Sequence, residues 1–110
     1  MTNITMKKIK AKIQNDKSIS KERQSELLKL LSILESEITE FSKTDAEQAE
    51  SITGFVERST HEATKKSKSP QLLELSLATL SESVKGFEAS HPGMVANVNG
   101  ICTVLGNMGI

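Results

Sequence analysis

The amino-acid sequence predicts an all-α protein, an antiparallel helical bundle of about four to five helices built from helical hairpins. Apolar residues recur at steps of three and four almost throughout its 110 residues, and no sustained alternation of β-branched residues occurs. Only three aromatic residues are present, all Phe. The core must therefore come from Leu, Ile, Val and Met, which suit helix packing. This length predicts one domain, residues 1–110.

The first predicted helix covers residues 5–15, with lysines on most of its faces. Its apolar residues fall at i, i+3 and i+7 and are Met6, Ile9 and Ile13. A short helix gains few hydrogen bonds for the cost of nucleating it. We therefore expect residues 1–20, a basic N-terminal helix and turn, to pack more loosely than the rest.

The second predicted helix covers residues 21–41, and Ser18 or Ser20 can serve as its N-cap. Leu28 and Ile33 widen its apolar stripe. The stripe consists of Leu27, Leu30 or Leu31, Leu34, Ile38 and Phe41. The link that follows is so short that the next helix must be an antiparallel neighbour.

The third predicted helix covers residues 45–65. Thr44 and Glu47 have the spacing of a capping box, which predicts Thr44 as the N-cap. Gly54 lies within this helix and should cost about 1 kcal/mol relative to Ala, unless it lets a neighbouring backbone approach. The apolar residues in register are Ala49, Ile52, Val56 and Ala63.

Residues 65–70 are rich in Lys and Ser and predict the linker between two hairpins. Ser69 followed by Pro70 is typical of an N-cap with proline in the first helical position. The fourth predicted helix ends near Ala89, because Pro92 disfavours helical backbone before it. Its main stripe is Leu73, Leu77, Leu80, Val84 and Phe87.

The fifth predicted helix covers residues 92–107 and has an unusual composition. No Asp, Glu, Lys or Arg occurs in residues 90–110, whereas a surface helix ordinarily carries charges. We therefore expect this helix to be deeply buried, within one chain or between two subunits. Gly106 and Gly109 are predicted to end it, with Met108 and Ile110 packing back.

The formal net charge of zero removes the simple case for a nucleic-acid or membrane-surface protein, but the charges are unevenly distributed. A basic arm precedes an acidic body. The arm is a candidate for binding phosphates of nucleic acid or anionic lipid, although a solvated helix face explains it more simply. Its residues are Lys7, Lys8, Lys10 and Lys12.

No residue pattern predicts an enzyme, a cofactor, a metal site or a small-molecule substrate. His61 starts a segment that superficially resembles the zinc-protease helix motif, but Lys65 stands where the second histidine is needed. His91 has no Ser, Cys or carboxylate at a spacing that demands partnership, which favours a structural role. The lone Cys102 lies in an apolar stretch and indicates a reducing compartment.

The end of the chain resembles a known family. Phe87-Glu88-Ala89-Ser90-His91-Pro92 is followed, after a helix length, by Asn107-Met108-Gly109-Ile110. This arrangement is similar to the ending of small bacterial proteins grouped as domain of unknown function 4404. The resemblance implies a bacterial origin and a cytoplasmic location. It implies no activity, since none is assigned to the family.

The sequence thus favours a non-catalytic module that binds another protein or forms a homodimer, in a regulatory or scaffold role. The alternative is an electrostatic nucleic-acid or membrane-surface binder that uses the basic arm. Replacing Val98 with Glu is expected to break the assembly and leave a helical monomer. The predicted interaction surface consists of Phe87, His91, Val95, Val98, Ile101 and Leu105.

Overall fold

The computed structural model describes residues 2–108, and within this range it contains five α-helices and no strand. This confirms the predicted all-α fold. The helices are α1 (Thr2–Asn15), α2 (Lys21–Ser42), α3 (Ala46–Thr64), α4 (Pro70–Ser83) and α5 (Pro92–Met108).

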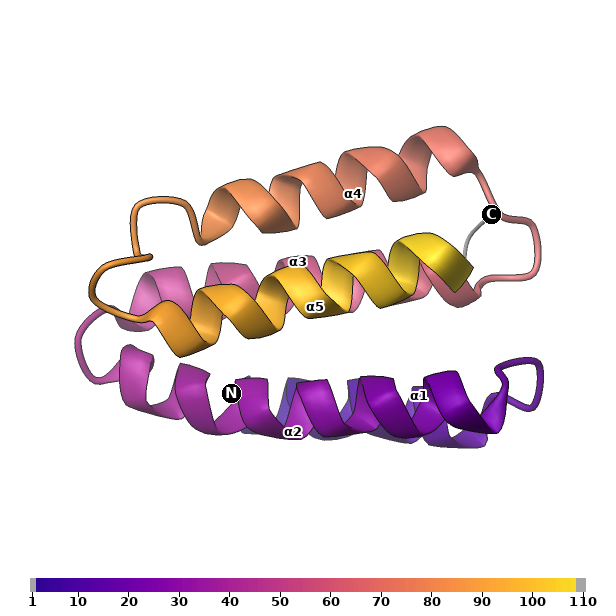
Figure 1. Cartoon of the computed structure of the whole chain (residues 1–110), viewed down its shortest axis with the longest axis horizontal. Coiled ribbons are helices and arrows are strands. Elements are labelled where there is room, and N and C mark those ends of the chain that lie inside the picture. The colour runs from indigo at the N-terminus through magenta and orange to yellow at the C-terminus, as the bar shows by residue number, and fades with distance from the viewer. Residues whose placement is uncertain (1, 109–110) are drawn as a thin grey trace.

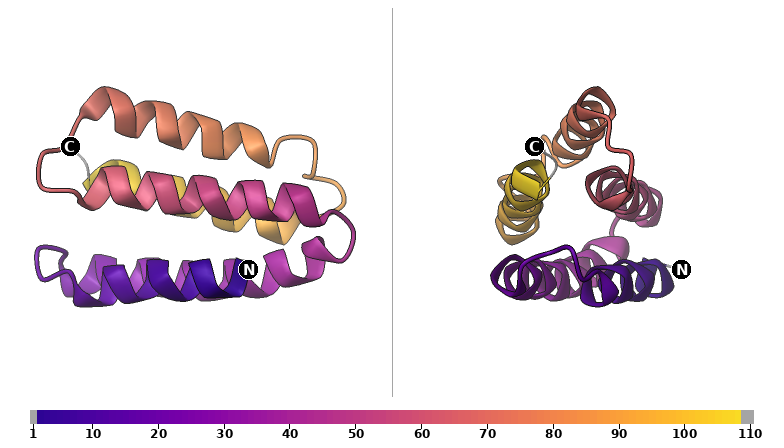
Figure 2. Two further views of the ribbon diagram at one scale, coloured as in Figure 1. Left: turned by 180° about the vertical axis from the view of Figure 1, so that it is seen from behind. Right: turned by 90° about the vertical axis from the view of Figure 1, so that its right-hand side faces the viewer.

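Successive helices run antiparallel, so the chain passes up and down the bundle five times (Figure 1). The end view in Figure 2 shows three layers, with α1 and α2 side by side, α3 and α5 above them, and α4 at the apex. The predicted hairpin partners do touch. The most extensive packing, however, joins α3 to α4 and α2 to α5.

A single apolar core runs through all three layers, and the first helix belongs to it. The looser packing expected for this helix is not observed, because Met6, Ile9 and Ile13 are fully or almost fully buried. They pack with the stripe of α2, in which Leu31 is buried and Leu30 only partly so. The expected stripe positions of the other helices lie in the same core, among them Ile52, Val56, Leu73, Leu80, Val98, Ile101 and Leu105.

Side-chain caps fix where three helices begin. Ser69 Oγ accepts from the Leu72 N–H with Pro70 following, as predicted. Of the two predicted candidates for the cap of α2, Ser20 is the one observed, and its Oγ accepts from the Arg23 N–H. The prediction of Thr44 as the cap of α3 is wrong by one residue. Asp45 is the cap and accepts from the Gln48 N–H at 3.0 Å, because a carboxylate is at least as good an acceptor for the free amides of a first turn.

The fourth helix ends at Ser83, six residues before the predicted end at Ala89. Val84 is its C-cap, and Gly86 follows with φ +96°, a backbone conformation that L side chains rarely adopt. The chain therefore leaves the helix at the glycine well before Pro92. As a consequence, Phe87 lies in the connection between α4 and α5 rather than on a helical stripe.

The last helix continues through Gly106 to Met108, so Gly106 does not terminate it as predicted. Its final carbonyls accept from cations on other elements. Arg23 Nη1 donates to the Asn107 carbonyl at 3.4 Å, and Lys68 Nζ donates to the Met108 carbonyl at 3.1 Å. These contacts satisfy the free acceptors at a negative helix end. Gly109 and Ile110 lie outside the described residues.

Candidate interaction surfaces

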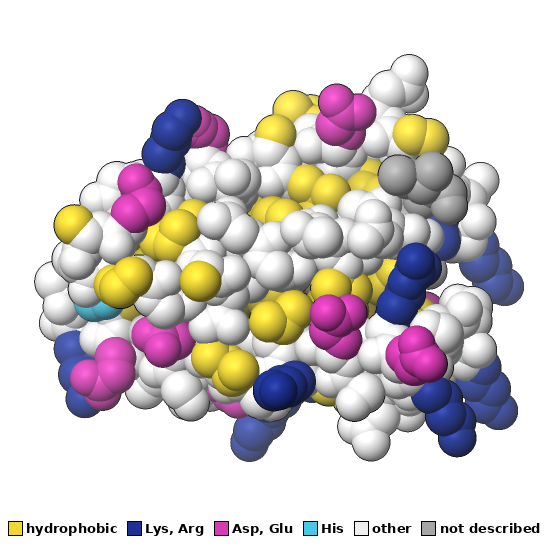
Figure 3. Space-filling view, viewed as in Figure 1, with side chains coloured by type: hydrophobic (Ala, Val, Ile, Leu, Met, Phe, Trp, Pro, Cys, Tyr) yellow, Lys and Arg dark blue, Asp and Glu magenta, His cyan; other side chains and the backbone are white. Residues whose placement is uncertain are grey.

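The exposed side of α5 carries no charge. One stripe of α5 is buried against its neighbours, and the opposite stripe faces outward with neutral side chains only. We call this stripe the α5 face. In Figure 3 the band along α5 is white and yellow, with charged side chains along its margins. The α5 face consists of Pro92, Ala96, Asn99, Thr103 and Asn107.

Apolar side chains of two other helices flank the α5 face. On the α2 side, Leu30 approaches Gly100 closely and is partly exposed, and Ile33, one turn further along α2, is 39% exposed. On the α4 side, a shallow hollow of about 480 Å³ is lined by Ala78 and Val95, with Lys85 among the charged residues at its edge. Apolar surface therefore continues from the α5 face onto α2, whereas charged side chains border it on the α4 side.

Only some residues of the predicted interaction surface are accessible to solvent. Val98, Ile101 and Leu105 have no exposed area and belong to the core of the chain, so they are not available to a partner. Val95 is partly buried and lines the hollow beside α4. The prediction selected the inward stripe because apolar periodicity marks the core side of a helix, whereas the outward stripe is distinguished only by lacking charge.

His91 has a structural position at the start of α5. Its ring lies edge-on to Phe41 with centroids 4.9 Å apart, and Phe87 packs on the same ring of Phe41 at 4.9 Å. Its backbone N–H donates to the Phe87 carbonyl, and its carbonyl accepts from the Val95 N–H. His91 and Phe87 therefore anchor the α4–α5 connection to α2.

The basic arm does not form one face. Lys10 Nζ lies 2.7 Å from Glu35 Oε1, and Lys7 lines a shallow hollow beside the same carboxylate of α2. Lys8 and Lys12 lie on the other flank of α1, toward α3. The predicted set of four lysines is thus divided between two sides, as helical geometry requires for these spacings.

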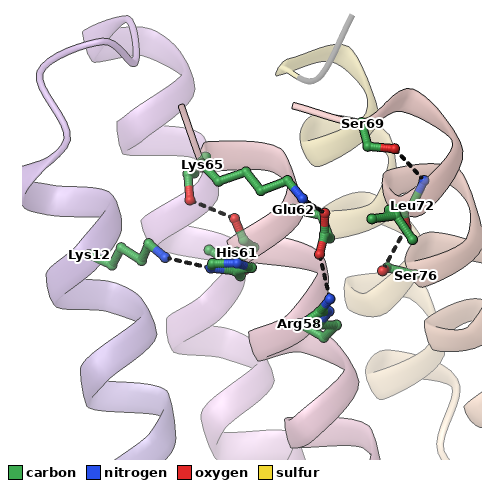
Figure 4. Close-up of polar contacts among 10 residues, drawn as sticks. Lys12, Arg58, His61, Glu62, Lys65, Ser69, Leu72 and Ser76 are labelled. Carbon is green, nitrogen blue, oxygen red and sulfur yellow. Dashed lines mark hydrogen bonds and ion pairs between the residues drawn. The ribbon is translucent and has the colours of Figure 1, made fainter. Parts of the chain in front are cut away.

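Glu62 is a feature that the sequence did not reveal. Its side chain has no exposed area, and its two carboxylate oxygens lie 2.8 Å from Arg58 Nη2 and 2.6 Å from Lys65 Nζ. Figure 4 shows this cluster on the side of α3 near the first turn of α4, where Ser69 and Leu72 lie. Contact with Lys65 lowers the pKa of Glu62 more than burial raises it, and the charges of Lys65, Arg58 and His61 lower it further.

The thiol of Cys102, the one cysteine of the sequence, is partly shielded from solvent. Cys102 is partly buried with its Sγ 3.8 Å from the Leu77 carbonyl, and burial raises the pKa of its thiol to about 11. Residues 2–108 include no group of three or more His, Cys, Asp or Glu side chains that could hold a metal ion. None of the five helices is long and apolar enough to cross a membrane.

Comparison with known proteins finds one family. No curated protein and no solved structure matches this chain. The family described as a domain of unknown function (DUF4404) matches residues 24–110, which include most of α2 and all of α3, α4 and α5. The chain therefore belongs to the DUF4404 family.

Proposed function

We propose that this protein is a non-catalytic interaction module that forms a homodimer through the α5 face. The observation that carries the proposal is the absence of charge from an exposed helix side in a chain whose residues are 25% charged. The centres of protein interfaces are depleted in charged residues in the same way. Leu30 and Ile33 add apolar surface at the margin.

A second copy of the chain is the occupant that this chemistry favours. A two-fold dimer brings the same patch of both subunits together, so like charges on the patch would repel. A neutral patch avoids this repulsion. The side-chain amides of Asn99 and Asn107 each offer donors and an acceptor, so they can hydrogen-bond to polar groups of the second copy.

The contacts of both histidines support a non-catalytic role. His91 packs against Phe41, and His61 accepts from Lys12, so each imidazole has a structural partner. The free and shielded Cys102 suits a reducing compartment. We further propose that the protein has a regulatory or scaffold role in the bacterial cytoplasm.

The test is the molar mass in solution, measured by light scattering over a range of protein concentrations and at two salt concentrations. We expect the wild-type protein to approach twice the chain mass of 12.0 kDa, with little effect of salt because no ion pair is required. Ala96→Glu places a charge at the centre of the α5 face and should hold the protein at the mass of one chain.

Ala11→Glu is the matched control. Ala11 is exposed on the outer side of α1, so the substitution adds the same charge to a helix away from the α5 face. Its molar mass should equal that of the wild type. A wild-type protein that stays monomeric at every concentration, or an Ala96→Glu variant that still dimerises, contradicts the proposal.

The alternative of a nucleic-acid or membrane-surface binder has weaker support from the geometry. Such binding requires a row of cations that can follow a phosphate backbone or a bilayer. The lysines of the arm point to two sides of α1, and Lys10 is already paired with Glu35.

A further inference from the structure

A basic hollow lies between α1 and α3, on a different part of the molecule from the α5 face. Its volume is about 450 Å³, and nitrogen-bearing side chains of both helices border it. Gly54 contributes no side chain, and a Cβ atom placed there would meet nothing within 4 Å. We call it the α1–α3 hollow, and it is lined by Lys8, Ile9, Lys12, Gly54, Glu57, Arg58, Thr60 and His61.

The cations of the hollow are incompletely neutralised. Among the described residues, Lys8 and Lys12 form no ion pair with any carboxylate. Arg58 uses one nitrogen for Glu62 and remains 60% exposed. Glu57 is the acidic residue of the lining, and it is paired with none of these cations. Lys8 and Lys12 therefore bring two positive charges to the hollow that no carboxylate of the described residues neutralises.

The contact between Lys12 and His61 determines which ring nitrogen of the neutral histidine can donate a hydrogen bond. Lys12 Nζ lies 3.4 Å from His61 Nδ1. An ammonium group can only donate, so Nδ1 is the acceptor and the proton of the neutral ring lies on Nε2. The ring thus has an N–H left to donate, in addition to the free N–H groups of Lys8, Lys12 and Arg58.

We propose that the α1–α3 hollow binds the phosphate group of a small soluble phosphorylated molecule. A phosphate offers several acceptor oxygens and up to two negative charges, which match converging donors from two helices. The hollow has the volume of a small-ligand site. The site is independent of the proposed dimer, because none of its residues belongs to the α5 face.

A small ligand fits this arrangement better than a polymer or a membrane. Only Lys8 and Lys12 of the arm reach the hollow, whereas Lys7 and Lys10 lie on the opposite flank near Glu35. The two lysines therefore do not continue into a longer row of cations that an extended phosphate backbone could follow. Binding to DNA or to anionic vesicles is therefore an outcome that would overturn the proposal.

The experiment is a titration of the full chain with inorganic phosphate and pyrophosphate at constant ionic strength, followed by NMR of the backbone amides. We expect saturable shifts confined to residues 8–12 and 54–61, with no matching effect of chloride. The double variant Lys8→Gln/Lys12→Gln should weaken pyrophosphate binding by about tenfold or more, since each lost charged hydrogen bond reduces affinity. Both lysines are exposed, so the fold should be retained.

The matched control is Lys7→Gln/Lys17→Gln, which removes the same charge outside the hollow at two exposed positions. It should bind pyrophosphate like the wild type. Equal weakening by both double variants would indicate general electrostatic attraction and overturn the proposal, as would shifts spread over all lysines. Single-stranded DNA and phosphatidylglycerol vesicles are tested in the same way. If the protein bound either of them and both double variants reduced that binding, the basic arm would be a polyanion-binding site and the proposal would be overturned. Molar mass, measured in parallel, should be unchanged in both variants, which separates this test from that of the dimer.

Discussion

The carboxylate of Glu62 can be buried in this small bundle because α3 and its C-cap residue supply the opposite charges. Arg58 and Lys65 stand four residues before and three residues after it, so both reach its carboxylate from neighbouring turns. The cluster is shallow, since Arg58 is largely exposed. Ser59, one turn away on the same side, is buried without a hydrogen-bond partner for its hydroxyl among the described residues.

The lowered pKa of Glu62 makes the stability of the fold depend on pH. A carboxyl group with a lower pKa in the folded state stabilises the fold above its ordinary pKa of 4.5, and this contribution is lost as pH falls through its folded pKa. We expect Glu62→Gln to lower the melting temperature at pH 7 and to approach the wild type at acidic pH. Thermal unfolding followed by circular dichroism measures both. Glu50→Gln, at an exposed position, is the control, and a Glu62→Gln deficit that persists unchanged in acid contradicts this account.

The raised pKa of Cys102 predicts low thiol reactivity. The thiolate is the reactive form, and its fraction near neutral pH falls when the pKa rises from 9.0 to about 11. We expect alkylation by iodoacetamide at pH 8 to be about a hundredfold slower in the folded protein than in urea, from this pKa difference alone. Mass spectrometry over time measures the two rates. Comparable rates would show that the thiol is accessible and ordinary.

Sequence alone predicted residue burial where the residue was apolar, but not where it was polar. The buried apolar stripes were identified correctly, since periodicity reports the inward side of a helix. Glu62 and Ser59 lie on the inward side as well, yet their residue types indicate a solvated face. The spacing of Arg58, Glu62 and Lys65 is the signal that could have identified the cluster.

At the scale of single helices, the predicted starts of α2, α4 and α5 are correct, because a serine cap or a proline marks each of them. Ser69 is predicted as a cap because Pro70 follows it, whereas for α2 the sequence leaves Ser18 and Ser20 open and the structure selects Ser20. Pro92 predicts an end of α4 near Ala89, but Gly86 comes first along the chain, and the helix ends before it at Ser83. Whether a glycine lies inside a helix or ends one depends on tertiary contacts that local sequence does not contain.

Gly54 and Gly86 should respond in opposite ways to alanine. Gly54 has helical neighbours and open space for a methyl group, so Gly54→Ala should raise the free energy of unfolding by about 1 kcal/mol. Gly86 has φ +96°, so Gly86→Ala should lower it by about 1–2 kcal/mol. Urea denaturation of the two variants and the wild type measures both changes. Destabilisation by Gly54→Ala would mean that this helix has no room for the side chain.

At the scale of the whole molecule, the helices and the contacts between sequential neighbours were predicted, but the contacts between distant helices were not. Short links made sequential neighbours antiparallel, and this held throughout. The principal contacts of α2 with α5 and of α1 with α3 join distant segments, and one sequence offers no signal for such pairs. The α1–α3 hollow therefore cannot be predicted from the sequence, although both of its lysines belong to the basic arm. The α5 face was anticipated as a charge-free segment, but which stripe faced outward could be assigned only in three dimensions.

Because α1 shares the core of the bundle, truncating one of its buried side chains should destabilise the whole protein. In a loosely attached arm the same change would have little effect. Ile13 is fully buried, and Gln24 of α2 donates to the carbonyls of Ile13 and Gln14, which holds the end of α1 against α2. Removing a buried Ile side chain to Ala costs about 2–5 kcal/mol when the surrounding core cannot collapse. We therefore expect Ile13→Ala to lower the free energy of unfolding by as much as Leu105→Ala, at the other end of the chain.

The control for this comparison lies on the same helix. Ile4 is 57% exposed, so Ile4→Ala should change the free energy of unfolding by no more than about 0.5 kcal/mol. Urea denaturation followed by circular dichroism should give one cooperative transition for each variant, since α1 shares its core with the other helices. If Ile13→Ala behaved like Ile4→Ala, or if α1 melted in a separate early phase, the first helix would be an appendage. The α1–α3 hollow would then lack the fixed wall that its lysines require.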